Sequence, residues 1–261
     1  MSGPPSLVGP TVLSSEQPGT HPATLLLNPD LAQFLRTEAI EDETCLPWAV
    51  SAVREATVSV MRLEVPSRAR SEFEKACGDL KKNKLSDAER HVRNAIGTFP
   101  NYVAAWVMLG QVLEARQQLE EAGHACQHAL SIDASYLPPY LCLAEISVRS
   151  QQWDAVLRLT GVAIAVNPFG DASAYFFRAM AYYHIHNVAA AEKSALTAAE
   201  IDRKHNEVRV YLLLGQIYEA EGNPGAAAGQ IRHFLKLSTD RQESRVAKQF
   251  LAELEGQQVP K

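Results

Sequence analysis

The feature that most constrains this chain is an internal repeat. From about Ser67 onward, mostly small residues recur in three columns, and every column has the same steps between successive members, about 34, 34, 35 and 36 residues. The columns are Ala76, Gly110, Ala144, Ala179 and Gly215; Ala88, Ala122, Val156, Ala191 and Ala227; and Ala95, Ala129, Ala163, Ala198 and Phe234. One column could arise by chance in an alanine-rich helical chain, whereas three columns with shared steps indicate repeated structural units.

A column of aromatic residues has the same steps. Its members are Trp106, Tyr140, Tyr175 and Tyr211, and Glu72 takes this place in the first unit. We expect each unit to be two antiparallel helices, A and B, in which the small residues let helix B approach helix A and the aromatic fills the space beside the neighbouring unit. No such unit buries its apolar face alone, so stacking must create one continuous core.

These columns resemble the tetratricopeptide repeat. The second and fifth units match its pattern best, through Trp106, Leu109, Gly110, Leu113, Ala122, Cys126 and Ala129, and through Tyr211, Leu214, Gly215, Tyr218, Ala227, Ile231 and Phe234. The resemblance implies an all-α fold, a right-handed α-solenoid of stacked helix-turn-helix repeats with a C-terminal capping helix. In its general sequence pattern the chain is also similar to bacterial repeat proteins of unassigned function.

The sequence divides into three parts. Residues 1–28 are rich in Pro, Ser, Gly and Thr and are expected to be a disordered tail. Residues 29–66 are a short lead-in, with a helical pattern over Asn28–Ile40 and a strand-like alternation over 57–65. The solenoid is expected over 67–257, as units of about 69–102, 103–136, 137–170, 172–205 and 208–241 followed by a cap helix over 241–255.

Charge, hydropathy and cysteine usage exclude several classes of protein. The net charge of −5 speaks against a nucleic-acid partner, which requires clustered Lys and Arg. No run of apolar residues is long enough to span a membrane, and the N-terminus has no signal-peptide pattern, so a soluble, cytoplasmic protein is expected. The four cysteines show no metal-binding spacing, which favours free, buried thiols in a reducing compartment.

Motifs for catalysis and metal binding are absent from the sequence. There is no phosphate-binding loop, nucleophile elbow, His-Glu-x-x-His pair or dinucleotide fingerprint. His124 and His128 share one helix face, but a metal site needs a third ligand, so they are interpreted as exposed histidines. We therefore expect no enzyme activity, no cofactor and no metal; an enzyme fused to the repeats is disfavoured because the remainder of the chain is short.

The resemblance also implies a binding site, because helices A of this family line a concave groove that commonly holds a peptide. The positions carried over are Val107, Gln111, Glu114, Leu141, Glu145, Arg149, Phe176, Met180, Tyr183, Arg209, Leu212 and Gln216. Their chemistry suits a partner peptide with one or two apolar anchors, although Phe176 and Met180 have an equally good alternative as core residues. The function implied is a non-catalytic scaffold for an unidentified protein or peptide partner. The alternative is an assembly element whose segment 29–65 docks on its own solenoid or pairs with a second copy.

Overall fold

The computed structural model describes residues 65–168, 171–202 and 207–257, which all belong to one unit, Glu38–Lys261. The predicted tail 1–28, the lead-in helix over Asn28–Ile40 and nearly all of the strand-like segment 57–65 lie outside these residues. The assembly hypothesis, which depends on segment 29–65, therefore stays a prediction.

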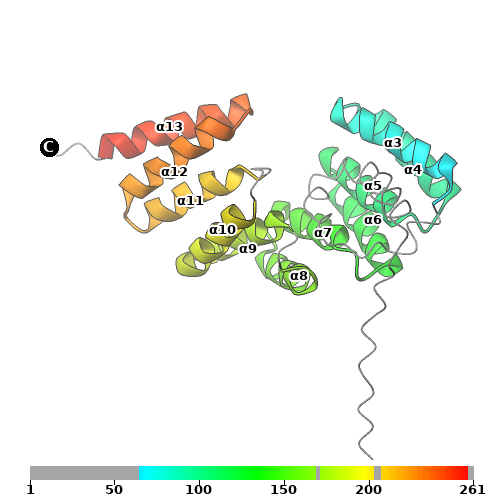
Figure 1. Ribbon diagram of the computed structural model, residues 1–261, viewed down its shortest axis with the longest axis horizontal. Helices are drawn as coiled ribbons and strands as arrows, with labels where there is room; N and C mark the ends of the chain where they lie inside the picture. The colour runs from blue at the N-terminus through cyan, green and yellow to red at the C-terminus, as the bar shows by residue number, and fades with distance from the viewer. Residues whose placement is uncertain (1–64, 169–170, 203–206, 258–261) are drawn as a thin grey trace, which may run out of the picture. The chain divides into compact units, whose positions relative to one another are not determined.

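The described part of the chain contains eleven helices and no strand (Figure 1). They are α3 (Ser67–Lys81), α4 (Leu85–Thr98), α5 (Val103–Ala115), α6 (Leu119–Ile132), α7 (Pro138–Arg149), α8 (Trp153–Val166), α9 (Ala172–His184), α10 (Val188–Ile201), α11 (Arg209–Ala220), α12 (Pro224–Leu237) and α13 (Arg241–Gln257). The predicted all-α repeat fold is confirmed.

Each unit is a helical hairpin, and the units stack in chain order. Within a unit helix A packs on helix B, as α5 does on α6, and each helix B then contacts helix A of the next unit. Helices A also contact one another along the stack, α5 with α7, α7 with α9 and α9 with α11. Helix α13 packs on α12 at the end of the series. Helices α5, α7, α9 and α11 therefore form one continuous layer, so a binding surface on that layer can draw residues from several units.

The small-residue columns lie where two helices approach most closely. Ala76, Ala144 and Ala179 on helices A are completely buried. A Cβ atom on Gly215 would come within 2.5 Å of the Ile231 Cδ1 atom on the partner helix. The equivalent atom on Gly110 would clash with the Cys126 sulfur, so in both units helix B fills the space that a larger side chain would need.

A residue with positive φ ends helix A in every unit. The residues are Asn83, Gln117, Gln151, His186 and Gly222, which have the same steps as the three columns. In the second unit, the backbone N–H of Gln118 donates to the carbonyl of Leu113 at 2.9 Å, and the other four units repeat this bond. This six-to-one bond closes a Schellman motif and satisfies a carbonyl that the helix end leaves without a partner. Only the fifth unit has glycine, the residue that adopts positive φ without strain.

The aromatic column joins successive units through its polar atoms. Trp106 Nε1 donates to the carbonyl of Pro100 at 2.7 Å, and the hydroxyl of Tyr140 donates to the carbonyl of Ala134 at 3.0 Å. The Tyr175 hydroxyl makes the same bond to Pro168 at 3.0 Å. Each aromatic thus packs beside the preceding unit and satisfies a carbonyl of the turn between the two units, which explains why Trp and Tyr, and not Phe, occupy this column.

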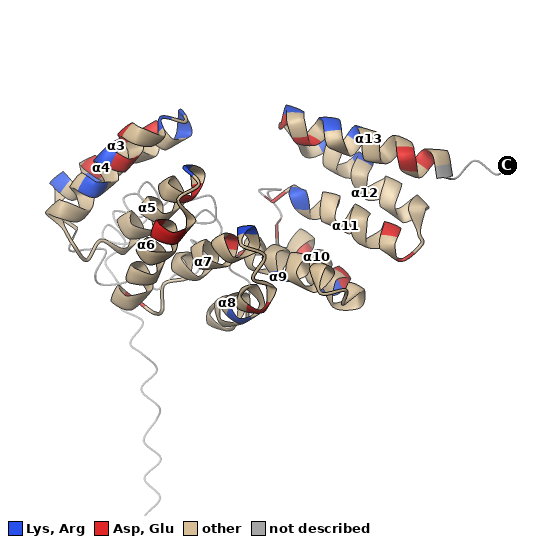
Figure 2. Ribbon diagram, turned by 180° about the vertical axis from the view of Figure 1, so that it is seen from behind, with Lys and Arg blue, Asp and Glu red and all other residues tan. Residues whose placement is uncertain are grey.

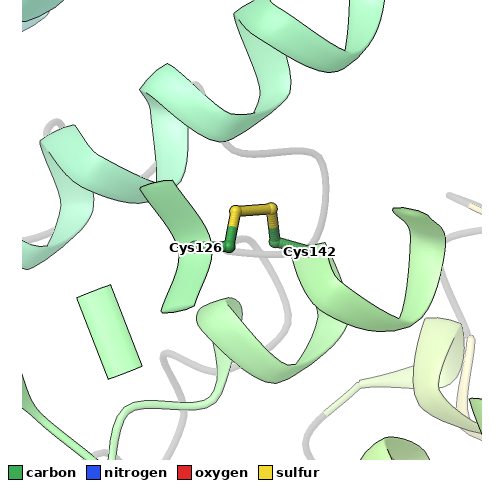
Figure 3. The surroundings of a disulfide bond; sticks show 2 residues. All are labelled: Cys126 and Cys142. Carbon is green, nitrogen blue, oxygen red and sulfur yellow. A yellow bond between two sulfur atoms is a disulfide. The ribbon is translucent and has the colours of Figure 1, made fainter. Parts of the chain in front are cut away.

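The cysteines correct a prediction. Cys126 on α6 and Cys142 on α7 are both buried and form a disulfide that joins the second unit to the third (Figure 3). Cys77 is also disulfide-bonded. The expectation of free thiols is wrong for these residues, because the fold brings together cysteines that no short sequence motif connects. Disulfides persist mainly in oxidising environments, so the pairing argues against the reducing compartment that the sequence favours.

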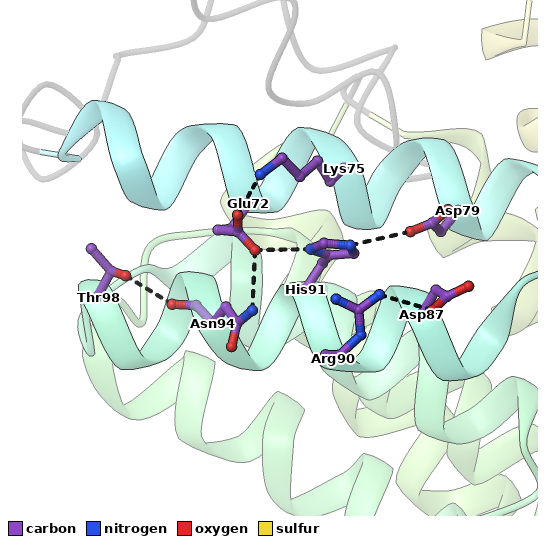
Figure 4. A network of polar contacts seen from close by, with 8 residues as sticks. All are labelled: Glu72, Lys75, Asp79, Asp87, Arg90, His91, Asn94 and Thr98. Carbon is purple, nitrogen blue, oxygen red and sulfur yellow. Dashed lines mark hydrogen bonds and ion pairs between the residues drawn. The ribbon is translucent and has the colours of Figure 1, made fainter.

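The first unit replaces its aromatic with a polar network centred on Glu72 (Figure 4). The Glu72 carboxylate lies 2.8 Å from His91 Nδ1 and accepts hydrogen bonds from Lys75 at 2.6 Å and Asn94 at 3.2 Å. The bond to His91, followed by those from Lys75 and Asn94, lowers the pKa of Glu72 to about 2. The network joins α3 to α4 at a position where the other units join two neighbouring repeats, so Glu72 suits a unit that has no described repeat before it.

Candidate functional site

The layer of helices A contains a cavity of about 360 Å³. Residues from α5, α7, α9 and α11 line it together with one residue at the start of α13. The lining residues are Glu114, Glu145, Val148, Arg149, Phe176, Phe177, Met180, Arg209, Leu212, Leu213, Gln216 and Glu243. A surface built from four successive units and the last helix suits an extended ligand better than a compact one.

Most of the groove positions expected from the sequence line this cavity. They are Glu114, Glu145, Arg149, Phe176, Met180, Arg209, Leu212 and Gln216. Val107 and Leu141 do not belong to a groove, because both are completely buried in the core. Gln111 is also buried, and neither its amide nitrogen nor its amide oxygen has a hydrogen-bond partner among the described residues. Tyr183 is partly exposed but does not line the cavity.

Four lining residues were not expected from the sequence: Val148, Phe177, Leu213 and Glu243. The first three directly adjoin the expected positions Arg149, Phe176 and Leu212, so a wider window around each position would have included them. Glu243 belongs to α13, which lies after the last repeat. The position of its side chain depends on how α13 packs on α12, and the repeat pattern carries no information about that packing.

The apolar part of the cavity has a buried floor and a more accessible wall. Phe176, Phe177 and Leu213 are buried, whereas Val148, Met180 and Leu212 are half-buried. Core packing and ligand contact, the two interpretations of Phe176 and Met180, therefore apply to different residues. Phe176 is mainly a core residue with one surface on the cavity, and Met180 has accessible area that a ligand can cover.

The cations of the cavity are paired with acidic residues of the same protein. Arg149 Nη1 lies 2.5 Å from Glu114 Oε1, and Arg149 Nη2 donates to Gln117 Oε1 at 2.6 Å, which ties the third unit to the second. Arg209 binds both carboxylate oxygens of Glu207, at 2.7 and 2.9 Å. Its guanidinium carbon lies 5.2 Å from the centroid of the Phe176 ring. Bidentate pairing and a contact with an aromatic face both hold a guanidinium in place.

Glu145 differs from these acidic residues. Within the described residues its carboxylate has no hydrogen bond and no direct ion pair, although α7 places it in the cavity wall. Burial, followed by repulsion from Glu114, raises the pKa of Glu145 to about 7, and attraction to Arg209 and Arg149 offsets only part of this effect. Figure 2 shows that charged residues are dense on α3, α4 and α13 and sparser on α5 to α9.

Among the described residues, no group of three His, Cys, Asp or Glu side chains has the geometry of a metal site. His128 instead contacts the ring of Trp106, with centroids 4.3 Å apart. No helix in the described part of the chain is both long and apolar enough to cross a bilayer.

A family model described as tetratricopeptide repeat matches residues 73–136, and the same hairpins and columns continue beyond that range. The chain has the tetratricopeptide-repeat fold. Proteins built from this repeat generally mediate protein–protein interactions and are typically non-catalytic. No curated protein matches the sequence.

Solved structures show the same fold at low sequence identity. TTC0263, a thermophilic tetratricopeptide-repeat protein from Thermus thermophilus, is 17% identical with a TM-score of 0.61 over 70% of this chain and 99% of its own. PilF from Pseudomonas aeruginosa is 13% identical with a TM-score of 0.60 over 73% of this chain and 90% of its own. A chain of the Cut9–Hcn1 hetero-tetramer of the APC/C is 15% identical with a TM-score of 0.70 over 90% of this chain but only 44% of its own. At these identities the similarity concerns the fold.

Proposed function

We propose that this tetratricopeptide-repeat protein is a non-catalytic scaffold that binds a segment of a partner protein in the cavity on helices A. The observation that carries the proposal is the cavity itself, which has an apolar floor, half-buried apolar side chains and a charged rim supplied by several units. Interfaces of this composition place apolar anchors in a pocket and use the polar rim for orientation.

The cavity is suited to binding and not to chemistry. Most of its charged side chains are held in ion pairs, and among its lining residues there is no serine, cysteine or histidine that could act as a nucleophile or proton shuttle. Met180 and Leu212 are well placed to contact a ligand, because they are larger than the half-buried Val148 and combine apolar area with partial exposure.

The test compares two double variants of the full-length chain as baits in extracts of the source cell. Met180→Ala with Leu212→Ala truncates the two largest half-buried apolar side chains of the cavity and leaves Val148 in place. Val162→Ala with Leu196→Ala is the matched control, since these side chains are 43% and 45% exposed on α8 and α10, two helices B. We expect a partner that the wild type and the control capture equally and that the cavity variant loses, with circular dichroism unchanged in all three. Equal capture by all three proteins would refute the proposal.

A further inference from the structure

The charge balance of the cavity is unequal. Glu114 forms an ion pair with Arg149, and Glu207 forms one with Arg209, so both guanidinium groups already have an acidic partner. Glu145 and Glu243 remain, and within the described residues neither carboxylate has a direct ion pair. When all these groups are ionised, the lining residues together with Glu207 contain four carboxylates and two guanidinium groups, so the cavity has an excess of negative charge.

The environment of Glu145 makes this excess costly. The groups that face it are Glu114 from α5, Arg149 from its own helix, Glu207 and Arg209 from the start of α11, and Glu243 from α13, while α9 contributes only the apolar Phe176, Phe177 and Met180. A carboxylate in such a wall is poorly solvated, and its neighbours compensate its charge only in part. A cation brought in by a ligand would supply the missing compensation.

The apolar wall adjoins this carboxylate. Val148 is three residues from Glu145 on α7, and positions three apart lie on one face of a helix. Met180 from α9 and Leu212 from α11 complete the accessible apolar area of the same cavity. A site with a partly compensated carboxylate beside apolar side chains matches a ligand whose cation is carried on, or lies next to, an apolar chain.

We infer that the cavity selects a partner segment in which an arginine or lysine stands next to one or two apolar residues, with the cation on Glu145 and the apolar side chains on Met180 and Leu212. This inference rests on the proposed function and names the chemical class of the bound segment. Acidic segments are excluded by the same charges, because they would add a further carboxylate to a cavity that already has an excess.

The selection depends on pH in a defined direction. Only the ionised form of Glu145 attracts the cation, and with a pKa of about 7 in the free protein most of it is protonated at pH 6. A site that is competent in only a fraction of molecules has its affinity reduced by that fraction, so binding is ~10-fold weaker at about pH 6 than at about pH 8. Arginine and lysine side chains keep their charge over this range.

The probe is a displayed library of random peptides of about 12 residues, long enough for an extended segment to cross several helices. Selection on the full-length protein is followed by synthesis of the peptides, and affinities are measured by fluorescence polarisation. Peptides are retained when Met180→Ala with Leu212→Ala weakens their binding. Glu145→Gln then removes the charge with little change in shape, Glu145→Asp keeps it, and Glu121→Gln on α6 neutralises an exposed glutamate outside the cavity.

We expect the retained peptides to contain an arginine or lysine beside an apolar residue. Glu145→Gln weakens their binding ~10-fold or more and removes its pH dependence. Glu145→Asp keeps part of the affinity and part of the pH dependence, and Glu121→Gln changes neither the affinity nor its pH dependence. Retained peptides that are neutral or acidic, or that bind the Glu145→Gln variant equally well, overturn this inference and leave the proposed function intact. If no selected peptide depends on Met180 and Leu212, both are refuted.

Discussion

The disulfide between Cys126 and Cys142 should stabilise the junction of the second and third units. It closes a short loop, since the two cysteines are 16 residues apart, and a cross-link of this length restricts the unfolded chain enough to contribute about 3 kcal/mol. Reduction also leaves two thiols in a site with little spare volume, because a Cβ atom on Gly110 would lie only 3.0 Å from the Cys142 sulfur and would clash with Cys126. The free energy of unfolding should therefore fall by about 3 kcal/mol or slightly more on reduction.

The assay is urea unfolding of the full-length protein followed by tryptophan fluorescence, with and without dithiothreitol. Trp106 on α5 and Trp153 on α8 lie on either side of the cross-linked junction. The double variant Cys126→Ala with Cys142→Ala is the reference, because Cys77 is also disulfide-bonded and responds to the same reductant. The contribution of this disulfide is the effect of dithiothreitol on the wild type minus its effect on the double variant.

The reasoning is refuted if the two proteins lose the same stability on reduction, within about 0.5 kcal/mol. Repeat proteins can unfold in segments, so the helices that contain Trp106 and Trp153 should also be followed separately by amide hydrogen exchange. Loss of protection confined to α3 and α4 would assign the effect to the bond of Cys77 instead.

Three further predictions concern stability. Burial raises the pKa of Asp171 to about 7, so the folded state binds a proton on this carboxylate more tightly than the unfolded state does. The free energy of unfolding should therefore fall as the pH rises from about 4 to about 7. In urea titrations, Asp171→Asn should remove this pH dependence and be more stable than the wild type by about 2 kcal/mol at pH 8. The pKa of Glu72 is lowered, so its contribution to stability depends on pH in the opposite direction. Glu72→Gln should reduce the free energy of unfolding by about 1–2 kcal/mol at neutral pH. In thermal melts, the difference in stability between this variant and the wild type should disappear as the pH falls from about 4.5 toward 2. At the turns, Gln151→Gly should stabilise the folded protein and Gly222→Ala should destabilise it, each by about 1 kcal/mol, because both positions have positive φ. If chemical unfolding shows that both variants change stability in the same direction, this account is contradicted.

The repeat columns predicted the fold because helix packing leaves few choices at the points of closest approach. At Gly215 even one added carbon would meet the Ile231 side chain, so only the smallest residues fit and their spacing reveals the unit. The positive-φ column carries the same steps but is chemically mixed, with Asn83, Gln117 and His186 among its members. A conformation shared by such different side chains leaves no compositional trace, and the turns could not be identified from residue types.

The cysteine prediction failed for a related reason. Cys126 belongs to helix B of one unit and Cys142 to helix A of the next, so their proximity comes from stacking and not from local spacing. Val107 and Leu141 show the corresponding difficulty at the binding surface. A position that faces the groove in one unit of the family can be covered in another, and both residues are completely buried here.

The residue that directly follows the small column on each helix A shows where sequence and site are connected. Consecutive helical residues are rotated by about 100°, so when the small residue faces helix B, the next side chain is directed away from that contact. In the third, fourth and fifth units these next residues are Glu145, Met180 and Gln216, and all three line the cavity. Close packing against helix B does not dictate their chemistry, so an acidic, an apolar and an amide side chain can occupy equivalent positions. Differences between units at this position are therefore the place where such a repeat can encode a partner, and Glu145 is the one whose charge the protein compensates only in part.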